Sequence, residues 1–484
     1  MQVTTEKFKG NVKSALGDDA LRSALKRATT QFVNKRKTAV AALANFEALR
    51  EYCGAVKAHT LDYLDYYTEQ LADSIESAGG HIHFAADAAE ANQIITDIAK
   101  KHNVKTAVKS KSMLSEEVNL NAALEKVGVI PIETDLGEYV LQIDQDVPSH
   151  IIAPIVHRSK EYVMKLFHEK LGTPADADVP QLTAAARQVL RQGFLEADMG
   201  ITGANFAVAE TGTVALVENE GNIRFSSSLP RVHVAMMGME KIIPRLRDLP
   251  AFLAVLPRSA TGQKSTSYVS MINGPRRDDE VDGPDEFHLV LVDNGRTGVL
   301  ADPKLRDALR CIRCGACLNA CPVYQQVGGH AYGWVYPGPI GAVLNPGLLG
   351  LEGTTNLPQA SSLCGACGEV CPVKIPLPEL LIEHRRRGVE RGLTPKSEQA
   401  GIGAFAFIAQ QPGLWDAGTK VARLGSQFLG RKGYLHGGWI PIMKEWLRER
   451  DFPQPPQTSF REIWRQELKH DGQANDRANE SGQA

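Results

Sequence analysis

Residues 311–322 read Cys311-Ile-Arg-Cys314-Gly-Ala-Cys317-Leu-Asn-Ala-Cys321-Pro322, and residues 364–372 read Cys364-Gly-Ala-Cys367-Gly-Glu-Val-Cys371-Pro372. Of the eight cysteines in the chain, only Cys53 lies outside these two runs. The first run has the C-x2-C-x2-C-x3-C-P spacing with which bacterial ferredoxins bind iron-sulfur clusters. The two runs together therefore predict a ferredoxin-like module with two clusters.

Thiolates three residues apart on a tight, glycine-containing loop can reach three irons of one cluster, while backbone N–H groups of the loop face its sulfides. In two-cluster ferredoxins the fourth cysteine of each run binds the other cluster, and the proline after it redirects the chain. Applied here, this crossover assigns Cys311, Cys314, Cys317 and Cys371 to cluster one, and Cys321, Cys364 and Cys367 to cluster two.

Two [4Fe-4S] clusters are the expectation, but cluster two is one thiolate short. Its fourth ligand would stand three residues before Cys364, where the chain has Ser361, followed by Ser362. A serine hydroxyl ionises far less readily than a thiol, so three outcomes stay open: a [3Fe-4S] cluster, a [4Fe-4S] cluster with a labile iron, or an unusual fourth ligand. His330, between the two runs, is one candidate for such a ligand.

Two other uses of clustered cysteines fit the sequence less well. Four-cysteine zinc sites need neither the third C-x2-C step nor two Cys-Pro endings. Disulfides form in oxidising compartments, whereas residues 1–13 are polar and charged and lack the features of a secretory signal. We therefore expect a cytoplasmic protein with reduced thiols, in which Cys53 is a small buried helix residue.

Length and composition narrow the function further. A chain of 484 residues is too long for one compact domain, so two or three are expected. A net charge of -2 gives no basic surface of the kind that nucleic-acid binding needs. The longest apolar stretches, such as 404–409, fall far short of the ~20 residues that span a bilayer. We expect a soluble protein whose membrane contact is at most peripheral.

Changes in residue pattern divide the chain into five parts. Residues 1–78 lack proline and predict an N-terminal helical region. Residues 79–298 alternate short β-branched runs with helical patterns, which predicts an α/β domain with a mostly parallel sheet covered by helices. Residues 299–392 contain the cysteine module, 393–469 a C-terminal helical region with several tryptophans, and 470–484 a polar disordered tail.

Within the α/β region we expect strands at 81–85, 105–108, 129–133, 205–218, 232–236 and 287–293, and helices at 88–102, 115–127, 160–171 and 181–196. Glu210 stands at a turn rich in small residues, and we interpret it as a carboxylate satisfied by backbone N–H groups rather than a site residue. His81 and His83 would face one side of a strand without a third ligand nearby in sequence. We expect polar edge residues there rather than metal ligands.

The segment between the cysteine runs contains aromatic residues on a glycine- and proline-rich backbone, from Gly328 to Pro339. Such residues could shield a cluster from water or form a docking surface, and packing explains them nearly as well. No glycine-rich phosphate-binding fingerprint occurs anywhere in the chain. Nucleotide binding therefore has no support.

The segments PSHIIAPIVH (148–157) and FAVAETGTVALVENEGN (206–222), followed by these two cysteine runs, resemble the lactate utilisation protein B (LutB) family. The resemblance covers the chain up to about residue 470 and includes the shortened second run, since the family likewise carries seven cluster cysteines. It implies that the α/β part is a LUD domain, similar to the NagB/RpiA/CoA-transferase-like fold. It also implies that the seven cysteines named above are the functional residues.

The resemblance further implies an electron-transfer protein in the oxidation of L-lactate to pyruvate. Its partners would be the A and C proteins of the same lactate utilisation system and a respiratory electron acceptor. The protein would itself be a non-catalytic component. Arg310, Arg313 and Lys374 flank the cysteines and would stabilise the reduced, more anionic clusters.

Two alternatives remain at this point. The chain could be an iron-sulfur subunit of another 2-hydroxyacid or glycerol-phosphate dehydrogenase, because related cysteine pairs occur there. It could also be an enzyme that uses an open iron of cluster two as a Lewis acid.

Overall fold

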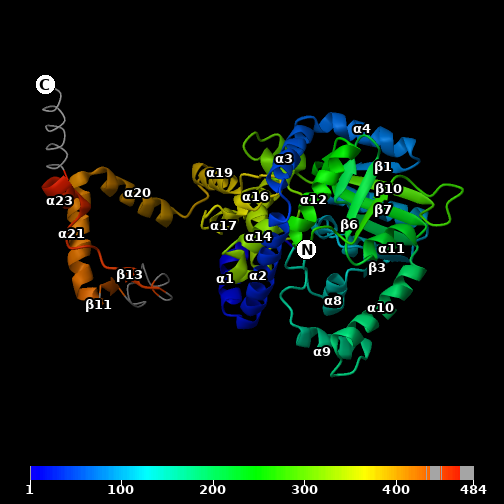
Figure 1. The fold of residues 1–484 in the computed structure, drawn as a ribbon, viewed down its shortest axis with the longest axis horizontal. Coiled ribbons are helices and arrows are strands. Elements are labelled where there is room, and N and C mark those ends of the chain that lie inside the picture. Colours follow the sequence, from blue (N-terminus) through cyan, green and yellow to red (C-terminus); the bar gives the residue numbers. More distant parts are fainter. Residues whose placement is uncertain (1, 432, 436–446, 448–449, 469–484) are drawn as a thin grey trace. The chain divides into compact units, whose positions relative to one another are not determined.

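The computed structural model describes residues 2–431, 433–435, 447 and 450–468 (Figure 1). The chain divides into two compact units, Met1–Leu393 and Thr394–Ala484. The predicted disordered tail 470–484, and also Trp439 and Trp446, lie outside the described residues.

The first unit contains a parallel six-stranded sheet with the strand order β1-β10-β7-β4-β2-β3 (Figure 1). Its strands are β1 (His81–Ala85), β2 (Thr106–Lys109), β3 (Ile130–Glu133), β4 (Met199–Gly203), β7 (Val232–Gly238) and β10 (Glu286–Val292). The central strands β4, β7 and β10 are buried along almost their whole length, as expected for parallel strands covered on both faces. The α/β fold class with a mostly parallel sheet is therefore confirmed.

The helices of this domain begin and end close to the predicted positions, with one exception. Residues 115–127 do not form one helix, because Asn119 adopts a left-handed conformation (φ 56°) and separates α6 from α7. The helices are α5 (Ala88–Lys101), α6 (Met113–Glu117), α7 (Leu120–Lys126), α8 (Leu136–Asp144), α9 (Lys160–Leu171), α10 (Val179–Glu196), α11 (Asn222–Ser228), α12 (Leu249–Ala260) and α13 (Arg296–Leu300).

A second, four-stranded sheet has the order β8-β5-β6-β9 and consists of β5 (Phe206–Val208), β6 (Thr213–Glu218), β8 (Ile242–Ile243) and β9 (Tyr268–Ile272). The stretch 205–218, predicted as strand with a turn at Glu210, is a hairpin of β5 and β6. Gly212 (φ 68°) makes its turn, and a Cβ there would lie 2.8 Å from the backbone of Ser74. Glu210, in the same turn, is exposed and accepts a hydrogen bond from the Leu246 N–H (2.9 Å), which agrees with its predicted role.

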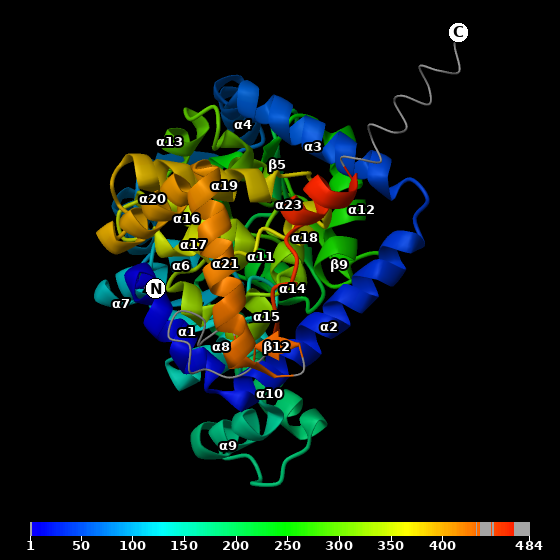
Figure 2. The same ribbon diagram turned by 90° about the vertical axis from the view of Figure 1, so that its left-hand side faces the viewer.

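The N-terminal helices pack against both the α/β domain and the cysteine module. They are η1 (Thr5–Lys7), α1 (Phe8–Leu16), α2 (Asp19–Ala41), α3 (Phe46–Asp62) and α4 (Leu64–Ser77). The side chain of Asp18 caps α2 by accepting the Leu21 N–H (2.9 Å). Helix α2 runs beside α14 and α15 of the cysteine module (Figure 2) and also contacts α12 of the α/β domain.

The cysteine module is built of short helices: η4 (Arg306–Arg310), α14 (Ala316–Ala320), α15 (Tyr324–Val327), η5 (His330–Tyr332), α16 (Gly338–Leu349), α17 (Asn356–Gln359), α18 (Ala366–Glu369) and α19 (Leu377–Glu390). The aromatic side chains of Tyr332, Trp334 and Tyr336 between the two runs are buried. They form the core of the module. Their burial fits the predicted roles in packing and in shielding a cluster, but not a docking surface.

The second unit contains α20 (Lys396–Gln410), α21 (Pro412–Leu429), the strands β11 (Gly430–Arg431), β12 (Tyr434–Leu435) and β13 (Phe452–Pro453), α23 (Phe460–Ile463) and a short π-helix, η6 (Trp464–Leu468). The strands pair antiparallel in the order β11-β12-β13. Over the whole described part of the chain, no helix combines the length and the apolar composition needed to cross a membrane.

Candidate functional site

The fold brings Cys311, Cys314 and Cys317 of the first run together with Cys371 of the second. These four cysteines line one small enclosed cavity, whose other walls include the apolar side chains of Ile151, Ile312, Ile340, Val373, Ile375 and Leu377. The loop that carries the first three bends sharply, because Arg313 (φ 58°) and Gly315 (φ 72°) are both left-handed. This is the set of four that the crossover assigned to cluster one.

The remaining three cysteines form a second group. The thiols of Cys321, Cys364 and Cys367 lie close enough to influence one another's ionisation. Their loop repeats the backbone of the first, with Leu363 (φ 55°) and Gly365 (φ 84°) left-handed at the positions that correspond to Arg313 and Gly315. Cys364 is exposed, whereas Cys321 and Cys367 are buried.

The donor set fits a group that carries positive metal ions. Burial raises the pKa of Cys317 and Cys314, and repulsion from neighbouring thiolates raises these values further. The same two causes raise the pKa of Cys367 to about 11. Several buried thiolates without compensating charge are unfavourable, and bound iron ions would supply that charge.

Ser361 occupies the position in the second loop that Cys311 occupies in the first. The Arg313 N–H approaches Cys311 Sγ (3.4 Å), and in the same way the Leu363 N–H donates to Ser361 Oγ (3.1 Å). Ser361 and Cys311 therefore match in local backbone geometry as well as in sequence position.

Several buried hydrogen-bond donors beside the cysteines lack a partner among the described residues, and two of them are the Tyr332 hydroxyl and Arg313 Nη1. The Tyr332 hydroxyl interacts electrostatically with Cys321, Cys317 and Cys367, so it lies near thiols of both groups. Arg313 Nη1 belongs to a side chain that is only 8% exposed. Orphaned donors of this kind are what sulfide acceptors of a cluster would satisfy.

Arginines from the N-terminal helices reach the second cysteine run. Arg50 donates to the carbonyls of Cys371 (Nε, 3.0 Å) and Glu369 (Nη2, 2.6 Å), and Arg36 donates to the carbonyl of Val370 (3.0 Å). Sequence reasoning missed both residues, because no spacing connects them with cysteines more than 300 positions away.

The three cations that the sequence placed beside the cysteines are each paired with carboxylates. Arg310 contacts Asp307 (2.6 Å), and Lys374 contacts Glu47 (2.6 Å) and Glu51 (2.9 Å). Arg313 contacts Glu240 (3.1 Å), and its guanidinium lies over the Tyr336 ring (4.5 Å). These partners reduce the net charge that each cation presents to a cluster.

Arg313 is the end of a buried charge network that also contains Glu240, Arg296 and Glu117. Arg296 is fully buried and contacts Glu240 through Nε (2.8 Å) and Glu117 through Nη1 and Nη2 (both 2.9 Å). The Tyr336 hydroxyl donates to Glu117. Burial alone would raise the pKa of Glu240, but the guanidiniums of Arg296 and Arg313 outweigh it and lower that pKa to about 2.

A cavity of about 270 Å³ opens beside this network, at the carboxyl ends of β2, β4 and β7. Ligands of open α/β sheets bind at this edge. Its lining includes Cys314 and Arg313 from the cysteine loop, and Lys111, Lys241 and Glu218 from the α/β domain. The lysines donate to carbonyl oxygens, Lys111 to Ile152 (2.6 Å) and Lys241 to Ala204 (2.5 Å). The cavity thus connects the LUD-like half with the cluster-one loop.

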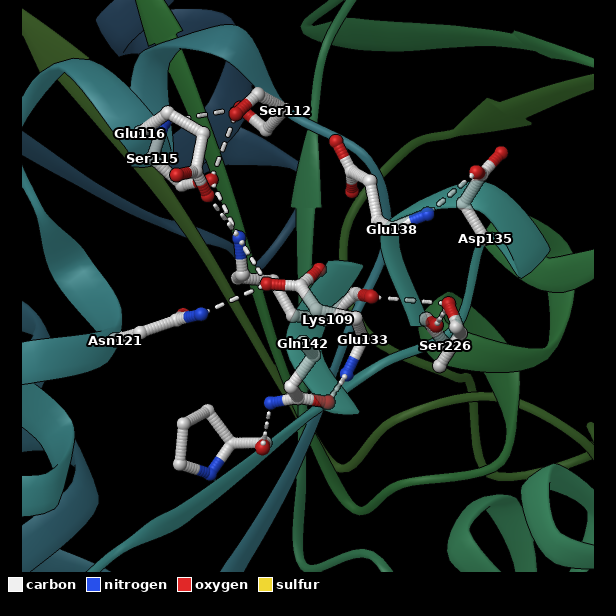
Figure 3. Close-up of polar contacts among 12 residues, drawn as sticks. Lys109, Ser112, Ser115, Glu116, Asn121, Glu133, Asp135, Glu138, Gln142 and Ser226 are labelled. Carbon is white, nitrogen blue, oxygen red and sulfur yellow. Dashed lines mark hydrogen bonds and ion pairs between the residues drawn. The ribbon is translucent and has the colours of Figure 1, made fainter. Parts of the chain in front are cut away.

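Next to this cavity lies a second buried polar cluster (Figure 3). Lys109, at the end of β2, points toward Glu133 (2.8 Å), Ser115 (2.8 Å) and Glu116 (3.1 Å). Burial, and then repulsion from Glu133, raise the pKa of Glu138 well above its usual value, and neither of its carboxyl oxygens has a hydrogen-bond partner in the described part of the chain. Its surroundings therefore favour the protonated, uncharged form of the Glu138 carboxyl.

Two histidine predictions and the lone cysteine are also placed. The sequence makes His330 a candidate cluster ligand. Its Nε2 bonds the Val147 carbonyl (2.8 Å) and its ring packs on His157, so its contacts are with the 146–157 loop. His81 and His83 lie on the edge strand β1, and both stack on His288. Cys53 is fully buried in α3, and burial raises its pKa to about 12.

Three family models match the chain. A LUD domain matches residues 68–292, a 4Fe-4S dicluster domain residues 307–375, and the C-terminal region of lactate utilisation protein B residues 383–469. Lactate utilization protein B of Bacillus licheniformis is 46% identical over 98% of this chain and 99% of its own length. This chain belongs to the lactate utilisation protein B family.

Other members are similarly close. Lactate utilization protein B of Bacillus subtilis is 46% identical and aligns over 96% of both chains. A protein of Escherichia coli K12 described as an uncharacterized electron transport protein, YkgF, is 43% identical over 96% of this chain and 97% of its own. The chain is therefore an iron-sulfur protein of lactate utilisation, with a LUD domain.

We expect Gly238→Ala to destabilise the protein by about 3 kcal/mol. A Cβ at Gly238 would stand 2.0 Å from Glu240 Oε2 and 2.4 Å from Arg296 Nε, so the buried network would have to move. Thermal unfolding measures the change. Gly298→Ala is the matched control, since a Cβ meets nothing within 4 Å there, and this substitution inside α13 should stabilise by about 0.5 to 1 kcal/mol.

Glu138→Gln should stabilise the protein relative to wild type, increasingly as pH rises. The pKa of Glu138 is higher in the folded state than in the unfolded state. The free energy of unfolding of the wild type is therefore unaffected by this group below the unfolded-state pKa, and it falls as pH rises from there toward the folded-state pKa. The difference should grow by at most about 1.4 kcal/mol per pH unit as pH rises above the unfolded-state pKa of about 4.3, measured by denaturant unfolding. The exposed Glu125→Gln is the control, and a pH-independent difference for Glu138→Gln would contradict the assignment.

Proposed function

We propose that this protein relays single electrons through two clusters between partner redox proteins during oxidation of L-lactate to pyruvate. Each L-lactate releases two electrons and two protons, and two one-electron clusters can pass on such a pair in single steps. The observation that carries the proposal is the grouping of the seven cysteines into two adjacent sets, of four and three. The protein itself is then a non-catalytic component of the lactate-oxidising system.

Cluster one would be held by Cys311, Cys314, Cys317 and Cys371, and cluster two by Cys321, Cys364 and Cys367. When bound, a [4Fe-4S] cluster exchanges one electron at a potential set by its hydrogen bonds, charges and exposure. The buried, apolar walls of the first cavity would keep cluster one dry. Tyr332 would lie between the two clusters and donate its otherwise unpaired hydrogen bond to one of them.

The two cysteine sites differ in exposure, which supports a separate point of electron exchange at each of them. Cys364 is exposed, so a partner can approach cluster two from solvent. The cluster-one loop instead lines the cavity in the LUD-like half. We propose the A and C proteins of the same system, and a respiratory acceptor, as the partners with which these two ends exchange electrons.

One observation favours a second role for the LUD-like half. Arg313 Nη1 is buried without a hydrogen-bond partner in the described residues, and no carboxylate of that part of the chain lies within 4.0 Å of Lys111 or Lys241 Nζ. All three cations line the cavity. A small anion bound there, next to the cluster-one loop, would pair with the two lysines, and for Arg313 Nη1 it would be an alternative acceptor to a cluster sulfide.

Anaerobic reconstitution with iron analysis and low-temperature EPR tests the relay. We expect about eight irons per chain and interacting signals in the dithionite-reduced state, with Ser361 Oγ as the fourth ligand of cluster two. Ser361→Ala should then hold about seven irons and show an oxidised three-iron signal, whereas Ser361→Cys should keep about eight. Bound zinc without an EPR signal in either state would end the electron-transfer proposal.

The same samples discriminate the Lewis-acid alternative. A relay predicts that L-lactate leaves the EPR spectrum of cluster two unchanged. Broadening of that spectrum on addition of L-lactate would indicate direct binding to an open iron, as an enzyme would require.

Tyr332→Phe should lower the reduction potential of the cluster that accepts the hydroxyl hydrogen bond by roughly 20 to 60 mV, which corresponds to the net worth of one such bond. The ring and its packing are kept, so unfolding and iron content should stay unchanged. Potentiometric EPR titration measures the shift. Tyr324→Phe is the control, because the Tyr324 hydroxyl donates to the Ser149 carbonyl (2.9 Å).

A further inference from the structure

Two histidines and a glutamate converge at the amino end of β10. The cavity described above lies at the other end of the parallel strands, at their carboxyl ends. His102 follows α5, and Glu286 and His288 open β10. Glu286 Oε2 lies 3.1 Å from His102 Nε2 and 3.3 Å from His288 Nε2. One atom from each residue lies within 4.8 Å of the other two, which is the spacing of ligands around a single metal ion.

The Nε2 atoms of His102 and His288 are both buried and have no hydrogen-bond partner among the described residues. They lie close to the carboxylate, but neither contact has the alignment of a hydrogen bond. The side chain of His288 is only 4% exposed, so bulk water cannot serve as the missing hydrogen-bond partner. Two orphaned nitrogens aimed at one carboxylate oxygen are the second observation that points to a bound cation.

The surroundings also resemble those of a metal-binding histidine. The other ring nitrogen of His288, Nδ1, lies 3.0 Å from His83 Nε2, and a hydrogen bond there orients the ring. Lys101 Nζ contacts the same Glu286 oxygen (3.0 Å) from a side chain that is 62% exposed. Lys101 can therefore neutralise the carboxylate when no metal is bound and move into solvent when one is.

A second histidine group in the structure provides a contrast. Asp146, His157 and His330 also lie within 4.8 Å of one another. There, however, His157 bonds Asp146 (3.0 Å) and Ser149 (2.6 Å), and His330 bonds the Val147 carbonyl. Its nitrogens are already satisfied, so that group needs no cation.

We propose that His102, Glu286 and His288 bind a divalent transition-metal ion of the zinc type. Two imidazoles and one carboxylate are a ligand set that such ions accept, with a fourth position left for water. The ion would join the end of α5 to the start of β10. It would be independent of the iron-sulfur clusters, because its ligands all belong to the α/β domain.

Co²⁺ binding to the cluster-loaded protein under anaerobic conditions tests the site. We expect one equivalent with tetrahedral d-d absorption, displaced by Zn²⁺, and no thiolate-to-cobalt charge-transfer band, which would signal exchange at the cysteines. Glu286→Gln and His288→Asn should abolish the spectrum. His83→Ala should weaken binding about 10- to 100-fold, as expected for a residue that orients a ligand.

Two further variants keep the test decisive if substitution of the buried His288 impairs folding. Lys101→Met removes an exposed competitor for Glu286 and should bind Co²⁺ more tightly than wild type. His81→Asn removes a histidine that only stacks on His288 (4.9 Å between ring centres) and should leave the affinity unchanged. Absence of a tetrahedral spectrum in wild type, or an unchanged affinity in Lys101→Met, would overturn the proposal.

Discussion

The buried network that joins Glu117, Arg296, Glu240 and Arg313 holds the first unit of this protein together. Its members come from α6, α13, the turn after β7 and the first cysteine loop, so it ties the LUD domain to the iron-sulfur module. Removing one partner from such a network leaves a buried charge unpaired, at a cost of about 3 to 5 kcal/mol. The cysteine loop is therefore held in one position against the sheet.

Two other parts of the chain contribute to the surroundings of the cluster-one cysteines. The N-terminal helices contribute Arg36 and Arg50, which bond carbonyls of the second run. The LUD domain contributes Ile151 and, through Glu240, the orientation of Arg313. In the proposed electron relay this construction would be an advantage, because fixed dipoles and the exclusion of water set the potential of a cluster and reduce reorganisation.

Predictions from local pattern succeeded where local chemistry dominates. Strand β1 and helix α9 begin and end at the predicted residues, since hydrophobic period and capping decide them. The helix predicted over 115–127 is interrupted at the left-handed Asn119, two residues after Glu117, which contacts Arg296, and the hydrophobic period gives no sign of this break. His83 lies on the edge strand β1, as expected, but only the pairing of β1 with β10 places it beside His288.

The sequence by itself determined the cofactor class, and it predicted the two cysteine sets and the missing thiolate at Ser361, because cluster binding depends on the spacing of a few thiols on a short loop. It also determined the family. The tertiary structure decided which charges surround those cysteines, that a cavity reaches the cluster-one loop, and that His102, Glu286 and His288 converge. These features join residues tens to hundreds of positions apart, and such distances are set by packing of the whole sheet and its helices rather than by any local pattern.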